Sequence, residues 1–92
     1  MTHDLKVEKQ YYRAIREGLK RFELRRNDRG YKVGDKIRFL VKEDFWGTCT
    51  VTKDRYRITY LLENVPEYGL KPGYCILGIK KERKSKGKEL VK

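Results

Sequence analysis

The sequence predicts a small α+β domain in which five or six short, mostly antiparallel strands curl into a barrel beside one prominent N-terminal helix. Short runs of alternating apolar and polar residues recur along the chain, and one early segment has helical spacing. A chain of 92 residues has room for a single core, and therefore for one domain. Short strands in a chain of this size must shield their edges, which favours closure into a small barrel.

The first strand and the helix are predicted from two different spacings. Residues 3–7 alternate between apolar and charged side chains, the pattern of a half-buried strand. Residues 8–17 place apolar side chains three and four positions apart, which predicts a helix. Gly18 should end this helix, because glycine tolerates the left-handed conformation found at helix C-termini.

Residues 20–25 are predicted to form the second strand. Phe22 and Leu24 alternate with charged residues, so we expect both to point into the core. Glu23 and Arg25 should then share the opposite face. On this assignment, Phe22→Ala would cost about 3–5 kcal/mol of stability.

The remaining strands follow in order along the chain. Residues 36–42 alternate cleanly and predict a strand. The phase of the alternation slips between 43–53 and 54–63, so an irregular excursion, either a hairpin or a bulge, should precede a long strand. Both prolines lie in 64–73, which predicts a loop. The last strand, 74–80, is apolar on both faces and should lie centrally in the sheet.

The expected core draws on the helix and on every predicted strand. Its residues are predicted to be Leu5, Val7, Ile15, Phe22, Leu24, Ile37, Phe39, Ile58, Ile76 and Leu77.

Positive charge is the strongest feature of the composition. There are 24 Lys and Arg against 13 Asp and Glu, a net charge of +11. Residues 81–92 contribute +4 and are expected to form a disordered basic tail, which leaves a net charge of +7 on a domain at residues 1–80. A basic surface with seven tyrosines suits RNA, whose phosphates attract cations and whose unpaired bases stack on aromatic rings. Deleting 81–92 should therefore weaken RNA binding without abolishing it.

The sequence predicts neither a metal site nor a cofactor. A single histidine, His3, and two distant cysteines do not supply the spaced ligands of a zinc site. Cys49 and Cys75 are interpreted as reduced thiols, and no apolar run approaches the length of a membrane span. We expect a cytoplasmic monomer that does not bind membranes. His3 is either a hydrogen-bonded, partly buried imidazole or a cleft residue.

The junction between helix and second strand carries a motif. Gly18-Leu19-Lys20-Arg21-Phe22-Glu23-Leu24-Arg25 matches GxKxxExR, the signature of the ASCH superfamily of PUA-like domains. The blocks at 3–6, 27–29, 33–35 and 68–74 also resemble a bacterial, archaeal and phage branch of unknown function. This resemblance covers roughly residues 2–80, and it implies a PUA-like β-barrel with a cleft beside the motif.

RNA is the ligand that the resemblance implies. Some relatives are enzymes, including a group that hydrolyses N4-acetylcytidine and another with reported nuclease activity. The amidohydrolases have Thr where this chain has Glu23, which argues against that activity here. If the chain is an enzyme, Lys20 would be its base or nucleophile and Glu23 a proton shuttle.

The predicted RNA site combines the motif with basic and aromatic neighbours. Its candidate residues are Lys20, Glu23, Arg25, Arg26, Arg29, Tyr68 and Lys71. Arg25 offers a planar fork for a phosphate or a base edge, and Glu23 could accept from a base amine or simply pair with a cation. Trp46 could stack on a base or pack half-buried. Two alternatives remain. The motif could be only a surface ion-pair network, or the chain could be a protein-interaction module in which the charge confers only solubility.

Overall fold

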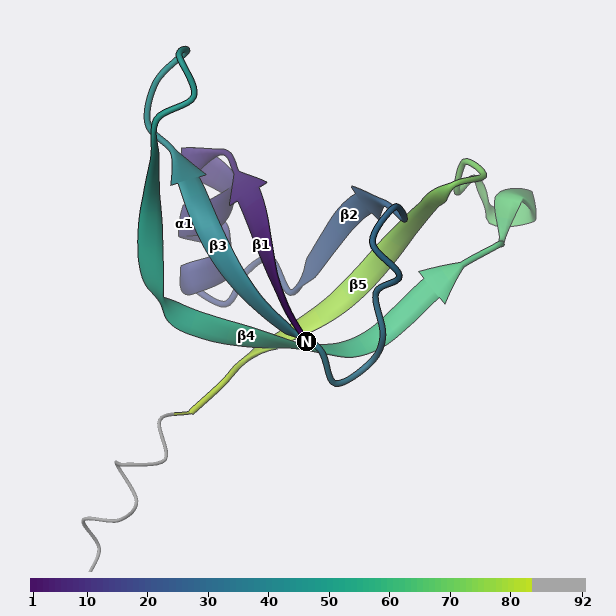
Figure 1. The fold of residues 1–92 in the computed structure, drawn as a ribbon. Helices are drawn as coiled ribbons and strands as arrows, with labels where there is room; N and C mark the ends of the chain where they lie inside the picture. The colour runs from purple at the N-terminus through teal and green to yellow at the C-terminus, as the bar shows by residue number, and fades with distance from the viewer. Residues whose placement is uncertain (84–92) are drawn as a thin grey trace, which may run out of the picture.

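The computed structural model describes residues 1–83, which form one curled five-stranded sheet and one helix (Figure 1). The elements in chain order are β1 (Thr2–Val7), α1 (Lys9–Arg16), β2 (Phe22–Arg26), β3 (Lys36–Lys42), β4 (Cys49–Glu63), a 3₁₀ turn (Pro66–Tyr68) and β5 (Tyr74–Lys81). The α+β class, the N-terminal helix and the five strands are as predicted, and β3 has the predicted bounds.

The sheet has the strand order β1-β3-β4-β5-β2. Three of the four pairings are antiparallel, and β1 pairs with β3 in parallel. In Figure 1 the sheet curls like a trough, with β1 and β3 on one wall, β2 on the other and α1 behind β1 and β3. β1 and β2 are the two edges of the sheet, so the predicted barrel is a half-barrel whose edges are not joined by backbone pairing.

The core occupies the inside of this curl. Seven of the predicted core residues are buried there: Leu5, Val7, Ile15, Ile37, Phe39, Ile58 and Leu77. Six others join them: Tyr12, Tyr31, Val41, Tyr56, Cys75 and Ile79. Phe39 is the largest fully buried side chain, and its ring lies 5.8 Å from that of Tyr12 and 5.5 Å from that of Tyr56. These three rings join α1, β3 and β4.

The predicted facing of β2 is wrong. Phe22 and Leu24 are 47% and 56% exposed, whereas Glu23 is 4% exposed. Glu23 lies opposite Leu77 of β5, and residues directly opposite in an antiparallel pair share one face of the sheet. Because Leu77 faces the core, Glu23 must face it too, and Phe22 and Leu24 must face away. Ile76, opposite Leu24, likewise lies outside the core cluster. The large cost expected for Phe22→Ala therefore does not hold.

β4 is longer and less regular than the alternation suggests. It starts at Cys49, so only residues 43–48 form the turn after β3. The β3–β4 register shifts between Arg38 and Leu40, opposite the predicted slip in phase. A second irregularity between Ile58 and Tyr60 turns Tyr60 outward, where it is 64% exposed. Extra residues on one strand of a pair change which face the following side chains occupy.

His3 is a buried, hydrogen-bonded residue and does not line the cleft beside the GxKxxExR motif. Its ring is buried and lies edge-on to the ring of Tyr31, and its Nε2 donates a hydrogen bond to Asp35 Oδ2 at 2.8 Å. Asp35 also accepts a hydrogen bond from the backbone N–H of Lys32. The hydrogen bond to His3 is the main cause that holds the pKa of Asp35 below its usual value. This cluster fastens β1 to the turn before β3.

Asp35→Asn is expected to make stability less dependent on pH. A carboxyl whose pKa is lowered by folding contributes stability that is present above about pH 4 and is lost as pH falls through the folded pKa. The variant should therefore melt at a lower temperature at pH 7 and lose less on acidification to pH 2, measured by circular dichroism. Asp28→Asn, at an exposed position, is the control. An unchanged acid transition in Asp35→Asn would contradict this.

β5 and the contacts of Glu82 extend past residue 80, where the sequence analysis placed the end of the domain. β5 continues to Lys81, and the carboxylate of Glu82 lies 3.5 Å from Lys36 Nζ and 3.7 Å from Arg57 Nε. The rest of the predicted tail lies outside the described residues. Both cysteines are free thiols, and burial raises the pKa of Cys75. Within residues 1–83, no helix has the length and apolar character needed to cross a membrane.

Candidate functional site

A buried carboxylate between two cations forms the centre of the candidate site. Glu23 Oε1 accepts a hydrogen bond from Lys20 Nζ at 2.8 Å, and Glu23 Oε2 accepts one from Arg25 Nε at 2.9 Å. The Glu23 side chain is 6% exposed, and those of Lys20 and Arg25 are 18% and 24% exposed. The motif therefore forms an ion triad with one more positive than negative charge. We call these three residues the triad.

The end of α1 places Lys20 over β2. Gly18 follows the helix with a φ of 77°, the left-handed conformation that was predicted to end it. The turned chain lets Lys20 Nζ donate a second hydrogen bond to the carbonyl of Phe22 and lie 4.8 Å from the centre of that ring. The centre of the Tyr11 ring lies 5.7 Å from Lys20 Nζ. All of these contacts are attractive for an ammonium ion.

Two arginines bridge the open edges of the sheet. Arg25 donates from Nη2 to the carbonyl of Lys6, and Arg29 donates from Nη1 to the carbonyl of Asp4 at 2.7 Å. Both carbonyls belong to β1, whereas Arg25 lies on β2 and Arg29 follows it. An unpaired strand edge leaves backbone acceptors without partners, and these guanidinium groups satisfy them. Arg25 and Arg29 thus have structural contacts as well as positive charge.

The triad lies in a hollow of about 460 Å³, which we call the motif cleft. Its lining residues are Lys6, Val7, Glu8, Tyr11, Lys20, Phe22, Glu23, Leu24, Arg25 and Lys42. Four of these are cations and two are carboxylates, so the cleft favours anions. Lys20, Glu23 and Arg25 all line this cleft, whereas no residue of the 68–73 loop, which we expected nearby, is among its lining residues.

Lys6 and Lys42 are cleft residues that sequence reasoning missed. Lys42 ends β3 and Lys6 is the penultimate residue of β1; the two strands are parallel, so both end on the same side of the molecule. The alternation of residues 3–7 and 36–42 shows two strands but not their relative direction. Without that direction, no signal in the sequence connects Lys6 with Lys42.

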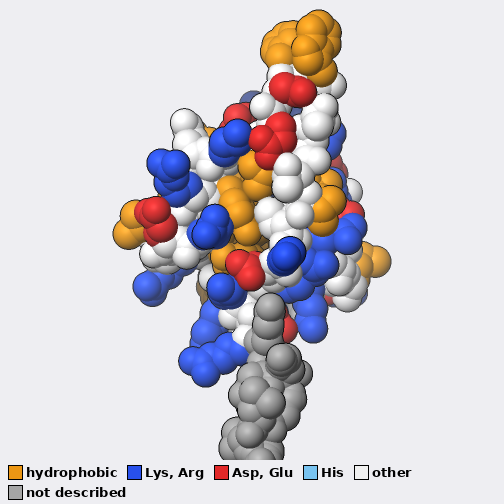
Figure 2. Space-filling view, turned by 90° about the vertical axis from the view of Figure 1, so that its left-hand side faces the viewer, with side chains coloured by type: hydrophobic (Ala, Val, Ile, Leu, Met, Phe, Trp, Pro, Cys, Tyr) orange, Lys and Arg blue, Asp and Glu red, His pale blue; other side chains and the backbone are white. Residues whose placement is uncertain are grey.

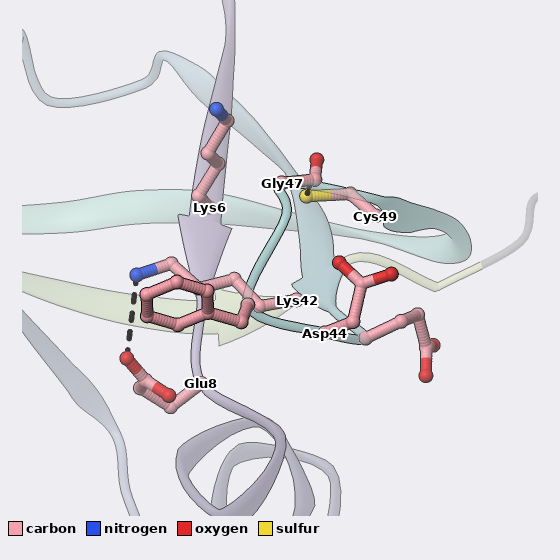
Figure 3. A pocket seen from close by; sticks show the side chains of 8 residues that line it. Lys6, Glu8, Lys42, Asp44, Gly47 and Cys49 are labelled. Carbon is pink, nitrogen blue, oxygen red and sulfur yellow. Dashed lines mark hydrogen bonds and ion pairs between the residues drawn. The ribbon is translucent and has the colours of Figure 1, made fainter.

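A second hollow of about 490 Å³ adjoins the motif cleft and shares Lys6, Glu8 and Lys42 with it (Figure 3). Lys42 Nζ lies 3.3 Å from Glu8 Oε2 at this boundary. The lining also contains Glu43 and Asp44, so carboxylates outnumber cations there. The pKa of Asp44 is lowered mainly by the backbone N–H of Thr48.

The turn at 43–48 carries exposed aromatic residues beside this hollow. Phe45 and Trp46 are 92% and 85% exposed, and the turn forms the apolar projection at the top of Figure 2. Trp46 is thus not half-buried. The carboxylates next to it oppose the approach of a phosphate backbone.

Four predicted site residues, Arg26, Arg29, Tyr68 and Lys71, do not line the motif cleft. Arg26 lies opposite Tyr74 in the β2–β5 ladder, and strand alternation puts it on the face opposite Arg25. Lys71 Nζ and the guanidinium of Arg26 each lie 5.9 Å from the centre of the Tyr74 ring. Tyr68 is 83% exposed in the loop between β4 and β5. The structure therefore divides the predicted site between two faces.

Comparison with known proteins gives one family. A family model described as a domain of unknown function (DUF3850) matches residues 2–79. No curated protein matches the chain. The matched segment contains the triad, the two bridging arginines and all of the elements except the last two residues of β5. The chain therefore belongs to the DUF3850 family.

Proposed function

We propose that this chain is an RNA-binding domain of the PUA-like ASCH type, acting in the cytoplasm. The motif cleft would take RNA or a nucleotide-sized piece of it. The observation that carries the proposal is the triad, because a buried carboxylate holds two cations in fixed positions at the base of an electropositive hollow. Cations held in place bind an anion without first losing side-chain freedom.

The parts of the cleft suggest how a nucleotide would bind. Lys6 and Lys42 at the mouth supply charge for phosphates, and the half-exposed rings of Tyr11 and Phe22 supply faces for a base. Glu23 already accepts from both neighbouring cations, so its first role is to position them. This arrangement supports the sequence interpretation in which Glu23 pairs with cations more than the one in which it reads a base amine.

The double variant Lys6→Gln/Lys42→Gln removes the two lysines at the mouth of the cleft. We expect it to bind RNA on the order of tenfold more weakly than the parent. Each lost phosphate contact should also reduce the slope of log affinity against log salt by about 0.7. Fluorescence anisotropy with a labelled single-stranded hexanucleotide, repeated at several salt concentrations, measures both quantities.

Lys32→Gln/Lys53→Gln is the matched control, since it removes the same charge from exposed lysines that do not line the cleft. We expect it to weaken binding much less. Equal losses of affinity in the two double variants would show that RNA binding depends only on the net charge of the protein. Binding that ignores salt altogether would instead favour the protein-interaction module.

A small amidohydrolase or nuclease acting on a modified nucleoside or RNA is the second candidate. The observation in its favour is the 2.8 Å contact between Lys20 Nζ and Glu23 Oε1 inside a cleft, a pairing through which a proton could pass. Chromatography of N4-acetylcytidine and short RNAs incubated with the protein tests it. Product formed by the parent and lost in Lys20→Met would support an enzyme; no product from the parent would leave binding as the function.

A further inference from the structure

A third hollow lies where α1 ends against β4 and β5, and we call it the helix-end hollow. It encloses about 790 Å³, more than the motif cleft. Its floor is formed by Ile15, Tyr56 and Ile79, which are 4%, 3% and 6% exposed. Figure 2 shows apolar side chains in the middle of one face of the molecule, with Lys and Arg side chains and some acidic side chains around them.

The helix-end hollow has a larger excess of positive charge among its lining residues than the motif cleft. Five cations line it, Arg16, Lys20, Arg21, Lys80 and Lys81, and its lining contains no carboxylate. Two of these cations have partners nearby, since Lys20 contacts Glu23 and Lys81 Nζ lies 3.5 Å from Asp54. Cations clustered around a low-dielectric floor attract anions more strongly than the same cations spread over a surface.

Three of the rim cations are available to a ligand. Arg16, Arg21 and Lys80 form no ion pair with any residue in 1–83. Arg21 donates from Nε to the carbonyl of Gly18 at 2.9 Å, which holds its guanidinium at the rim. The other two guanidinium nitrogens of Arg21 remain for an acceptor such as a phosphate oxygen.

Lys20 belongs to both hollows. It lines the motif cleft and the helix-end hollow, which therefore meet at the turn between α1 and β2. A ligand that leaves the motif cleft past Lys20 next meets Arg21 and Arg16. The combination of an apolar floor and a basic rim suits a ligand that has flat or apolar parts between regularly spaced anions, as a nucleic-acid strand has.

We propose that the helix-end hollow is a second phosphate-binding site, which takes the backbone of the same RNA strand as it leaves the motif cleft past Lys20. This inference rests on the proposed function, because it extends the ligand from one nucleotide to a strand. The motif cleft alone would bind a mononucleotide. A strand long enough to pass Lys20 would bind more tightly, since it engages both sites at once.

Amide spectra of the full chain, titrated with uridine monophosphate and with hexauridylate, test the proposal. The amides of Gly18, Thr59 and Lys80 report on the helix-end hollow, and those of Phe22 and Leu24 report on the motif cleft. Uridine monophosphate should shift the cleft amides alone, and hexauridylate should shift both sets.

Arg16→Gln/Lys80→Gln should weaken hexauridylate binding several-fold and leave the affinity for uridine monophosphate unchanged. Lys32→Gln/Lys53→Gln, with the same net charge, should retain hexauridylate affinity. The spectra of both variants also show whether the fold is intact.

The outcomes separate this inference from the proposed function. Hexauridylate shifts confined to the cleft amides, or equal losses in the two double variants, would overturn the second site and leave the cleft as the RNA site. Shifts confined to the hollow would overturn the path between the sites. The absence of shifts in both sets would overturn the proposed function, and the second site with it.

Discussion

Replacing Phe39 with alanine is expected to lower the free energy of unfolding by about 3–5 kcal/mol. Phe39 is fully buried in the middle of β3 and packs its ring against Tyr12 and Tyr56. Its removal would leave a cavity among three elements and take apolar surface out of the centre of the core. A domain of this size has only about 5–10 kcal/mol of stability, so much of the variant should be unfolded on mild heating.

Phe22→Ala is the matched control for Phe39→Ala. Phe22 is the same residue type, but its side chain is about half exposed at the edge of the sheet. We expect a loss of about 1 kcal/mol or less, because only part of the ring leaves water on folding. Urea unfolding of both variants measures the difference. A larger loss in Phe22→Ala than in Phe39→Ala would show that β2 faces the core as alternation suggested, and would overturn the burial of Glu23.

Glu23→Leu is expected to lower the free energy of unfolding by about 2–4 kcal/mol. Removing one member of a buried ion pair leaves the other without compensation, and here two cations lose the same carboxylate. The cost falls below that of a fully buried pair because Lys20 and Arg25 keep some contact with water. The loss should also loosen the attachment of β2 to β1, since Arg25 bonds both Glu23 and the carbonyl of Lys6.

A double-mutant cycle isolates the ion pair. Lys20→Met/Glu23→Leu should lose less than the sum of its two single variants, with a coupling of about 1–2 kcal/mol. Glu67→Leu, which changes an exposed glutamate outside the triad, should lose about 0.5 kcal/mol or less. Additive losses in the cycle would show that the ion pair between Lys20 and Glu23 contributes no coupling energy. The triad would then not support the proposed site.

The strands were largely predictable because alternation is a local property. Residues 36–42 alternate over their whole length, and the structure gives β3 those bounds. Residues 8–17 were predicted as a helix and α1 spans Lys9–Arg16, ended by Gly18 as expected. Even the irregularity in β4 was visible, because a shift in register changes the parity of the apolar residues.

Which face of a strand is buried was less predictable than where the strand lies in the sequence. Alternation in residues 22–26 says that two faces differ but does not say which one is buried, and the assumption that apolar side chains face inward failed there. β2 is an edge strand whose facing follows from its pairing with β5. A carboxylate can lie on the buried face there because Lys20 and Arg25 both compensate its charge.

The sequence by itself determined the order of the elements, the basic character of the surface and the residues of the triad. Each of these depends on composition or on neighbours within a few positions. The tertiary structure decided that β1 and β3 run in parallel, which brings Lys6 and Lys42 to the cleft, and that Arg26 and Lys71 lie on another face. It also decided that Lys20 serves two hollows. Strand direction and register arise from contacts between distant segments, and hydrophobic periodicity within one segment carries no information about them.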